Sequence, residues 1–107
     1  MVRQIDVNEL KALLDGGGNV WLLDVRQPWE HALVALPQST LIPLDQLGRR
    51  ASEVVPGEGG LVVAYCHHGV RSLHAAQLLS LQGIEAVSLA GGIDRWSSEI
   101  DPALPRY

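Results

Sequence analysis

The stretch Leu61-Val62-Val63-Ala64-Tyr65-Cys66-His67-His68-Gly69-Val70-Arg71-Ser72 decides how this chain folds. Its first five residues form an uninterrupted apolar run, which is typical of a strand buried on both faces of a parallel sheet. In the residues that follow, 73–82, Leu73, Ala76 and Leu79 recur at helical spacing and predict a helix. Cys66 is therefore expected between a strand and a helix N-terminus, where unpartnered backbone N–H groups favour negative charge.

Outside this stretch, short apolar runs alternate with amphipathic segments. Further strands are predicted over residues 20–25, 40–43 and 84–89, and further helices over residues 7–15, 44–50 and 93–99. Asp6 and Glu9 have the spacing of a capping box at the start of the first helix. Residues 101–107 contain two prolines and are expected to form an extended tail. The alternation predicts an α/β fold with a mainly parallel central sheet and helices on both faces.

Length and composition restrict the class of protein. With 107 residues, we expect a single domain over residues 1–107, and the content of 47% hydrophobic and 19% charged residues is that of a globular protein. The net charge of −4 and the scattered basic residues argue against a nucleic-acid partner. No apolar stretch approaches the ~20 residues that span a bilayer, and residues 1–9 lack the layout of a secretory signal. We therefore expect a cytoplasmic protein with no membrane partner.

Cys66, the only cysteine, is the candidate nucleophile. A single cysteine cannot form an internal disulfide, and the alternative to a reactive residue is an inert thiol buried in the core. The helix start and Arg71 favour a reactive thiolate instead. Because a cation in the first helical turn opposes the helix dipole, Arg71 needs a local anion, either a substrate oxyanion or the Asp24 carboxylate. Gly69 is expected to adopt a positive φ so that successive N–H groups converge.

Asp24 and Arg26 lie at the end of another predicted strand, at the edge of a parallel sheet where ligands bind. We expect them to support the site, or to serve the structure alone, with Arg26 able to pair with Glu30 four residues on. His67 and His68 adjoin Cys66, but adjacent residues rarely converge on one metal ion. Since no suitably spaced Cys or His pair is present, we expect no metal and no cofactor. The two histidines are expected to contribute backbone N–H groups to the loop.

The spacing of Cys66 and Arg71 is C-x4-R, one residue shorter than the C-x5-R of phosphate-binding cysteine loops. We expect the shorter loop to enclose a pocket for one sulfur atom. The motif CHHGVRS, residues 66–72, resembles the six-residue active loop of the rhodanese sulfurtransferases. Asp24-Val25-Arg26 with Glu30, and residues 41–44 and 90–96, are similar to other signatures of that family, so the resemblance spans essentially the whole chain. At residues 35–39 the family often has a histidine and a Gly-Ala pair, whereas this chain has neither histidine nor glycine there.

The resemblance implies a single rhodanese-like domain and a sulfurtransferase of the thiosulfate sulfurtransferase type. In such an enzyme Cys66 would be the catalytic residue, taking sulfane sulfur from a donor such as thiosulfate as a persulfide and passing it to a thiol or cyanide acceptor. The substrate-binding residues would then be those of the loop, namely His67, His68, Gly69, Val70, Arg71 and Ser72. Two alternatives remain: a non-enzymatic persulfide carrier or interaction module that serves a sulfur-relay partner protein, and, less expected, a cysteine-dependent phosphatase or arsenate reductase.

Overall fold

The computed structural model describes residues 2–107, which fold around a five-stranded sheet. The strands are β1 (Gln4–Ile5), β2 (Val20–Asp24), β3 (Thr40–Leu41), β4 (Leu61–Tyr65) and β5 (Ala86–Leu89). They lie in the order β1-β5-β4-β2-β3, and every neighbouring pair is parallel. The apolar strand β4 is central, as its composition predicts. The predicted α/β class with a parallel sheet is therefore confirmed.

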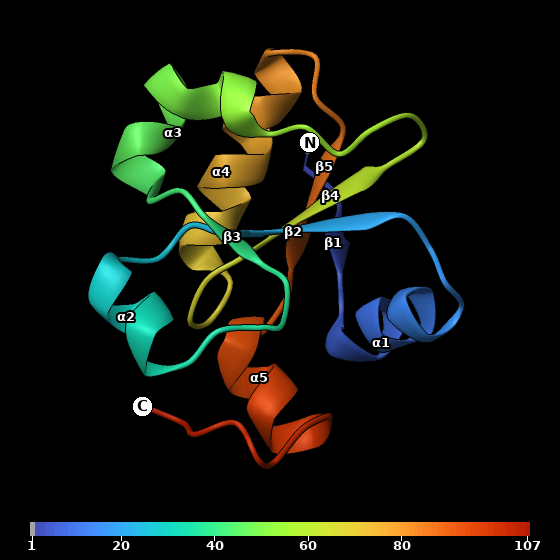
Figure 1. Ribbon diagram of the computed structural model, residues 1–107, viewed down its shortest axis with the longest axis vertical. Helices are drawn as coiled ribbons and strands as arrows, with labels where there is room; N and C mark the ends of the chain where they lie inside the picture. The colour runs from blue at the N-terminus through green and yellow to red at the C-terminus, as the bar shows by residue number, and fades with distance from the viewer. Residues whose placement is uncertain (1) are drawn as a thin grey trace.

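The helices cover both faces of the sheet. They are α1 (Val7–Asp15), α2 (Pro28–Leu33), α3 (Leu44–Arg50), α4 (Val70–Leu81) and α5 (Gly92–Glu99), with the short 3₁₀ helix η1 (Ala51–Glu53) after α3. In Figure 1, α1 and α5 lie to one side of the sheet and α3 and α4 to the other. Alternate residues of β4 follow this division: Val63 and Tyr65 pack with α1 and α5, while Val62 and Ala64 pack with α3 and α4.

The predicted capping box at the start of α1 is confirmed. The Asp6 carboxylate accepts the backbone N–H of Glu9 at 2.8 Å, and the Glu9 carboxylate accepts the N–H of Asp6 at 3.2 Å. The helix then buries Leu10 against the sheet and ends at Asp15, before Gly17 takes a φ of 72°. The bounds of α3 and β4 also agree with the prediction.

Two elements were missed because they are too short to show a period. These are β1, of two residues, and α2, of six residues, which has Pro28 in its first turn and whose Glu30 carboxylate accepts the N–H of Gln27 at 3.0 Å. Helix α4 begins at Val70, three residues before the predicted start, because Gly69 is already its N-cap.

Smaller departures concern the ends of elements and the tail. Strands β2, β3 and β5 are shorter than predicted, and α5 begins one residue earlier, at Gly92. The tail is not extended throughout, since the N–H of Leu104 donates to the carbonyl of Asp101 in a turn. In the segment where the resembled family often has glycine, Gln38 adopts a φ of 63°, a left-handed conformation that is costly for a residue with a side chain. Within residues 2–107 no helix has the combination of length and apolar character that crossing a membrane requires.

Candidate active site

Cys66 lies at the carboxyl edge of the sheet, directly after β4. Asp24 and Tyr65 are register partners at the ends of β2 and β4, and the N–H of Val25 donates to the carbonyl of Tyr65 at 3.1 Å. These pairings bring the residues that follow β2 next to the Cys66 loop, defined as residues 66–72. Cys66 is only 1% exposed and packs on the face of the sheet that α3 and α4 cover.

The loop curls back onto the cysteine sulfur. Gly69 takes a φ of 109°, as predicted, and its N–H donates to Cys66 Sγ at 3.1 Å. The thiol in turn is 3.6 Å from Ser72 Oγ, which shares a hydrogen bond of 2.7 Å with Ser88 Oγ. Because α4 begins at Val70, its first-turn N–H groups, which lack partners within the helix, lie in the same loop. The Gly69 N–H and the N-terminus of α4 thus favour negative charge on the sulfur.

Helix α5 holds the first part of the loop from the other side. The N–H of Ile93 donates to the carbonyl of Cys66 at 2.9 Å, and the N–H of Asp94 donates to that of His67 at 3.1 Å. This close approach requires Gly92, which has a φ of 61°, because a Cβ atom there would overlap the carbonyls of both Cys66 and His67. The N-termini of two helices therefore converge on the cysteine.

The anion that faces Arg71 is Glu30, and not Asp24. Arg71 Nη1 and Nη2 donate to Glu30 Oε1 and Oε2 at 2.6 and 2.9 Å, a two-point ion pair that joins α4 to α2. Burial would raise the pKa of Glu30, but hydrogen bonds from Arg71, from the N–H of Gln27 and from Tyr107 outweigh it and lower the pKa to about 2. Glu30 is consequently ionised at neutral pH, and it balances the charge of Arg71 within the protein.

Asp24 and Arg26 pair with each other, so the predicted pair between Arg26 and Glu30 is wrong. Arg26 Nε and Nη2 donate to the two oxygens of Asp24 at 2.9 and 2.7 Å, and both side chains are fully buried. Burial would lower the pKa of Arg26, but its hydrogen bonds, first of all to Asp24, outweigh this and raise the pKa. Asp24 also contacts His31 Nδ1 at 2.8 Å and accepts from the Tyr65 hydroxyl at 3.2 Å. The pair thus ties β2 to β4 and α2, while its supporting role in the chemistry stays a prediction.

The imidazoles of His67 and His68 stack on each other, with ring centroids 4.0 Å apart and planes inclined by 18°. His68 is largely exposed and its Nδ1 lies 3.8 Å from Asp94 Oδ2, whereas His67 is turned inward and its pKa is lowered, chiefly by burial. In the part of the chain that the structure describes, no group of three or more His, Cys, Asp or Glu side chains is placed to hold a metal ion.

Two residues beside the loop were not predicted to act there. Glu30 forms part of a quoted signature, but its spacing from Arg26 pointed to a local pair instead of a partner 41 positions away. Tyr107 stacks on His67 with centroids 3.9 Å apart, although it lies at the far end of the tail. No pattern in the sequence indicates a contact between a tail residue and a distant loop, so this contact could not be predicted.

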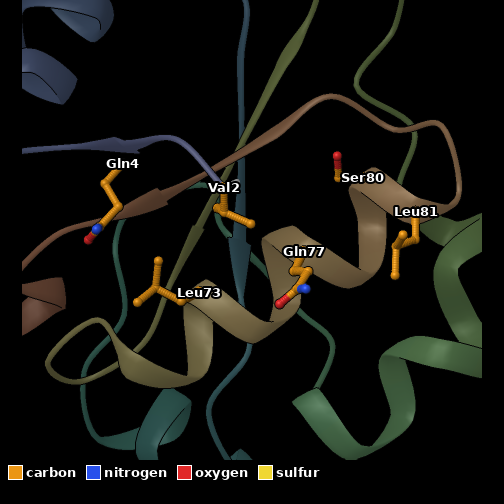
Figure 2. A pocket seen from close by; sticks show the side chains of 6 residues that line it. All are labelled: Val2, Gln4, Leu73, Gln77, Ser80 and Leu81. Atoms are coloured by element: carbon orange, nitrogen blue, oxygen red, sulfur yellow. The ribbon is translucent and has the colours of Figure 1, made fainter.

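Two pockets open on the surface of the protein. Figure 2 shows one of about 510 Å³ whose lining combines residues near β1 with one side of α4, namely Val2, Gln4, Leu73, Gln77, Ser80 and Leu81. A second, of about 350 Å³, is lined largely by apolar side chains that include Trp21 and Trp96. Neither lining contains a residue of the Cys66 loop.

Comparison with known proteins gives a consistent result. Residues 6–99 match the family described as Rhodanese-like domain. A protein from Allochromatium vinosum named "Sulfurtransferase" is 36% identical, covering 91% of this chain and 90% of that protein. "Adenylyltransferase and sulfurtransferase MOCS3-2" from Zea mays is 34% identical over 97% of this chain, which spans only 23% of that relative's length. Among solved structures, a rhodanese-like domain protein from Staphylococcus aureus superposes with a TM-score of 0.83 at 29% identity, covering 99% of each chain.

Proposed function

The chain belongs to the rhodanese-like family of sulfurtransferases, and we propose that it transfers a sulfane sulfur from thiosulfate to a nucleophilic acceptor through a persulfide on Cys66. The observation that carries the proposal is the placement of the only cysteine: its sulfur accepts the Gly69 N–H at 3.1 Å inside a C-x4-R loop at the start of α4. Donors of this kind activate a thiolate and stabilise the charge of a persulfide.

In the first step the Cys66 thiolate attacks the outer sulfur of thiosulfate. A sulfur–sulfur bond forms to Cys66 as the bond between the two sulfur atoms of thiosulfate breaks, and its electron pair leaves with sulfite. The product is a negatively charged persulfide, which the Gly69 N–H and the first-turn amides of α4 would surround. A thiolate is itself nucleophilic, so its attack needs no general base.

In the second step an acceptor such as cyanide or a thiolate attacks the outer sulfur of the persulfide. The new bond to the acceptor forms as the persulfide bond breaks, and the electron pair returns to Cys66 as a thiolate. With cyanide the product is thiocyanate, and with a thiolate it is a new persulfide. Removing one preorganised donor from a developing anion costs roughly 3–4 kcal/mol in well-studied enzymes, so the loop amides can contribute as much as a charged side chain.

In this scheme Arg71 does not act as an unpaired cation above the Cys66 sulfur, because it is paired with Glu30. Arg71 Nη1 and Nη2 both donate to Glu30, so Arg71 would shape the loop through this ion pair. Only the N–H groups that do not face Glu30 would remain to bind an anionic substrate such as thiosulfate. His67, His68, Val70 and Ser72 would complete the binding surface through the backbone of the loop and the Ser72 hydroxyl.

The long relatives favour a second candidate function. The chain spans about a quarter of the length of several curated relatives, whose names combine an adenylyltransferase with a sulfurtransferase. A persulfide carrier that serves a partner protein would load sulfur on Cys66 once and release it slowly to small acceptors. A free-standing enzyme would turn over thiosulfate and cyanide continuously, so steady-state thiocyanate formation separates the two.

The proposal is tested by measuring thiocyanate formation from thiosulfate and cyanide with the wild-type protein and with Cys66→Ser. We expect turnover by the wild type and none by the folded variant, and hydrolysis of an aryl phosphate by neither. Phosphatase turnover without sulfur transfer would instead favour the cysteine-dependent phosphatase or arsenate reductase class. The single-domain organisation over residues 1–107 and a cytoplasmic location stay predictions from the sequence.

A further inference from the structure

The tail brings one aromatic side chain onto the Cys66 loop. After α5 the chain runs past the carboxyl edge of the sheet and ends beside α2 (Figure 1). The ring of Tyr107 stacks on the imidazole of His67, with centroids 3.9 Å apart and planes inclined by only 11°. His68 stacks on the other face of His67, and Trp29 meets Tyr107 edge-on at 5.8 Å. Tyr107, His67 and His68 therefore form a stack of three rings at the start of the Cys66 loop.

His67 depends on this stack for its position. Its Nε2 atom is buried and has no hydrogen-bond partner among residues 2–107. A buried imidazole nitrogen without a partner gives no directional restraint to the ring. The orientation of His67, the residue next to the nucleophile, is consequently set by the rings of Tyr107 and His68 that pack on its two faces.

The hydroxyl of Tyr107 contacts the carboxylate that pairs with Arg71. It donates to Glu30 Oε2 and accepts from Arg26 Nη1 at 2.9 Å. Glu30 in turn holds Arg71 through two hydrogen bonds. Burial and the Glu30 carboxylate raise the pKa of Tyr107 to about 12, so the hydroxyl stays protonated and remains a donor at neutral pH.

We propose that Tyr107 is a positioning residue for sulfur transfer, which fixes His67 through its ring and the Glu30–Arg71 pair through its hydroxyl. These contacts act on the first and the fifth of the six loop residues that follow Cys66, so one side chain restrains both ends of the cradle. The inference rests on the proposed function, because the cradle is the part of the protein that would hold the persulfide. Tyr107 touches neither the sulfur nor the donor in this account.

A purely structural role is the alternative, since Tyr107 also packs against the core cluster of α1 and α5. The two roles differ in whether another substitution with a similar loss of stability also slows sulfur transfer. Leu13 of α1 packs against the same cluster, and Leu13→Ala removes apolar contact there without touching the loop. Leu13→Ala therefore serves as the control for stability, and Tyr107→Phe separates the hydroxyl from the ring.

The experiment measures single-turnover persulfide formation from thiosulfate, steady-state thiocyanate formation and thermal unfolding for the wild type, Tyr107→Ala, Tyr107→Phe and Leu13→Ala. We expect Tyr107→Ala to slow persulfide formation about tenfold or more, Tyr107→Phe to slow it less, and Leu13→Ala to stay within about twofold of the wild type at a similar loss of stability. Wild-type kinetics in folded Tyr107→Ala, or an equal loss of rate in Leu13→Ala, would overturn the inference.

An NMR titration of His67 tests the contact between Tyr107 and His67 even if the wild type transfers no sulfur. The groups that face this imidazole are His68, Asp94, Glu30 and Arg71, and burial is the main cause that lowers its pKa. Taking away the Tyr107 ring exposes His67, so its midpoint should rise toward about 6.5 in Tyr107→Ala and stay low in Tyr107→Phe. The resonance is identified by its loss in His67→Gln. An unchanged midpoint in Tyr107→Ala would refute the contact itself, whereas failure of transfer in the wild type alone would refute only the proposed function.

Discussion

Glu30 and Arg71, which lie 41 positions apart in the chain, join α2 to the first turn of α4 through hydrogen bonds of 2.6 and 2.9 Å. The Glu30 side chain is 5% exposed and that of Arg71 35%. The cation that would oppose the dipole of α4 is therefore neutralised by a buried carboxylate of a neighbouring helix. This pair fixes one wall of the loop without using the cysteine sulfur.

We expect Glu30→Gln to weaken both the fold and the chemistry. The substitution removes a charge-assisted pair and leaves Arg71 without its counter-ion, which should cost about 1–3 kcal/mol of the free energy of unfolding. The loop should then hold thiosulfate less well, with a fall of about tenfold in kcat/KM for sulfur transfer. Denaturant unfolding and steady-state kinetics measure the two effects.

The matched control for this prediction is Glu53→Gln. Glu53 forms a similar two-point pair with Arg50, at 2.8 and 2.9 Å, but on the exposed surface after α3. Solvent screens exposed pairs and they contribute little, so the control should change stability little and sulfur transfer not at all. Equal effects of the two substitutions would show that the Glu30–Arg71 pair contributes no more to stability and sulfur transfer than an exposed ion pair does.

The low pKa of Glu30 should make the free energy of unfolding depend on pH. The pKa of Glu30 is about 2 in the folded protein against an ordinary value of 4.5, so the unfolded chain binds the proton more tightly. Its stabilisation is thus complete above about pH 4.5 and is lost as the pH falls toward 2, by at most about 3 kcal/mol. Unfolding free energies measured across this window should fall less steeply in Glu30→Gln than in the wild type. Identical acid profiles would contradict the assignment.

A side chain at position 92 should clash with the Cys66 loop. Gly92→Ala adds a Cβ that overlaps the carbonyls of Cys66 and His67 at a φ of 61°, so α5 must move away from the loop. We expect a loss of about 2 kcal/mol or more of the free energy of unfolding, together with slower sulfur transfer. Gly48→Ala is the control, because a Cβ at Gly48 meets nothing within 4 Å in α3, and alanine there should stabilise by about 0.5–1 kcal/mol. A neutral Gly92→Ala would show that α5 does not hold the loop closely.

The sequence predicted those parts of the fold that depend on local pattern. The apolar run of β4, the capping box of Asp6 and Glu9 and the glycine at the loop are local signals, and each has the structure that was expected of it. The two-residue β1 and the six-residue α2 are shorter than any period that a pattern can show. Their positions depend on pairing and packing with distant residues.

The ion pairs could not be assigned from spacing. Arg26 and Glu30 are four residues apart, which on a helix would make them partners, yet Arg26 precedes α2 and turns to Asp24 instead. The helix dipole correctly indicated that Arg71 needs a local anion. Glu30 could not be identified as that anion, because α2 itself was not predicted. The contact of Tyr107 with His67 likewise depends on where the tail runs in space.

The intact mass of the protein after incubation with thiosulfate tests most directly whether Cys66 carries the sulfur. We expect the wild type to become heavier by one sulfur atom, a thiol reductant to reverse the gain, and folded Cys66→Ser to gain nothing. If the wild-type protein acquires no sulfur from thiosulfate, or if Cys66→Ser acquires as much as the wild type, Cys66 is not the sulfur carrier.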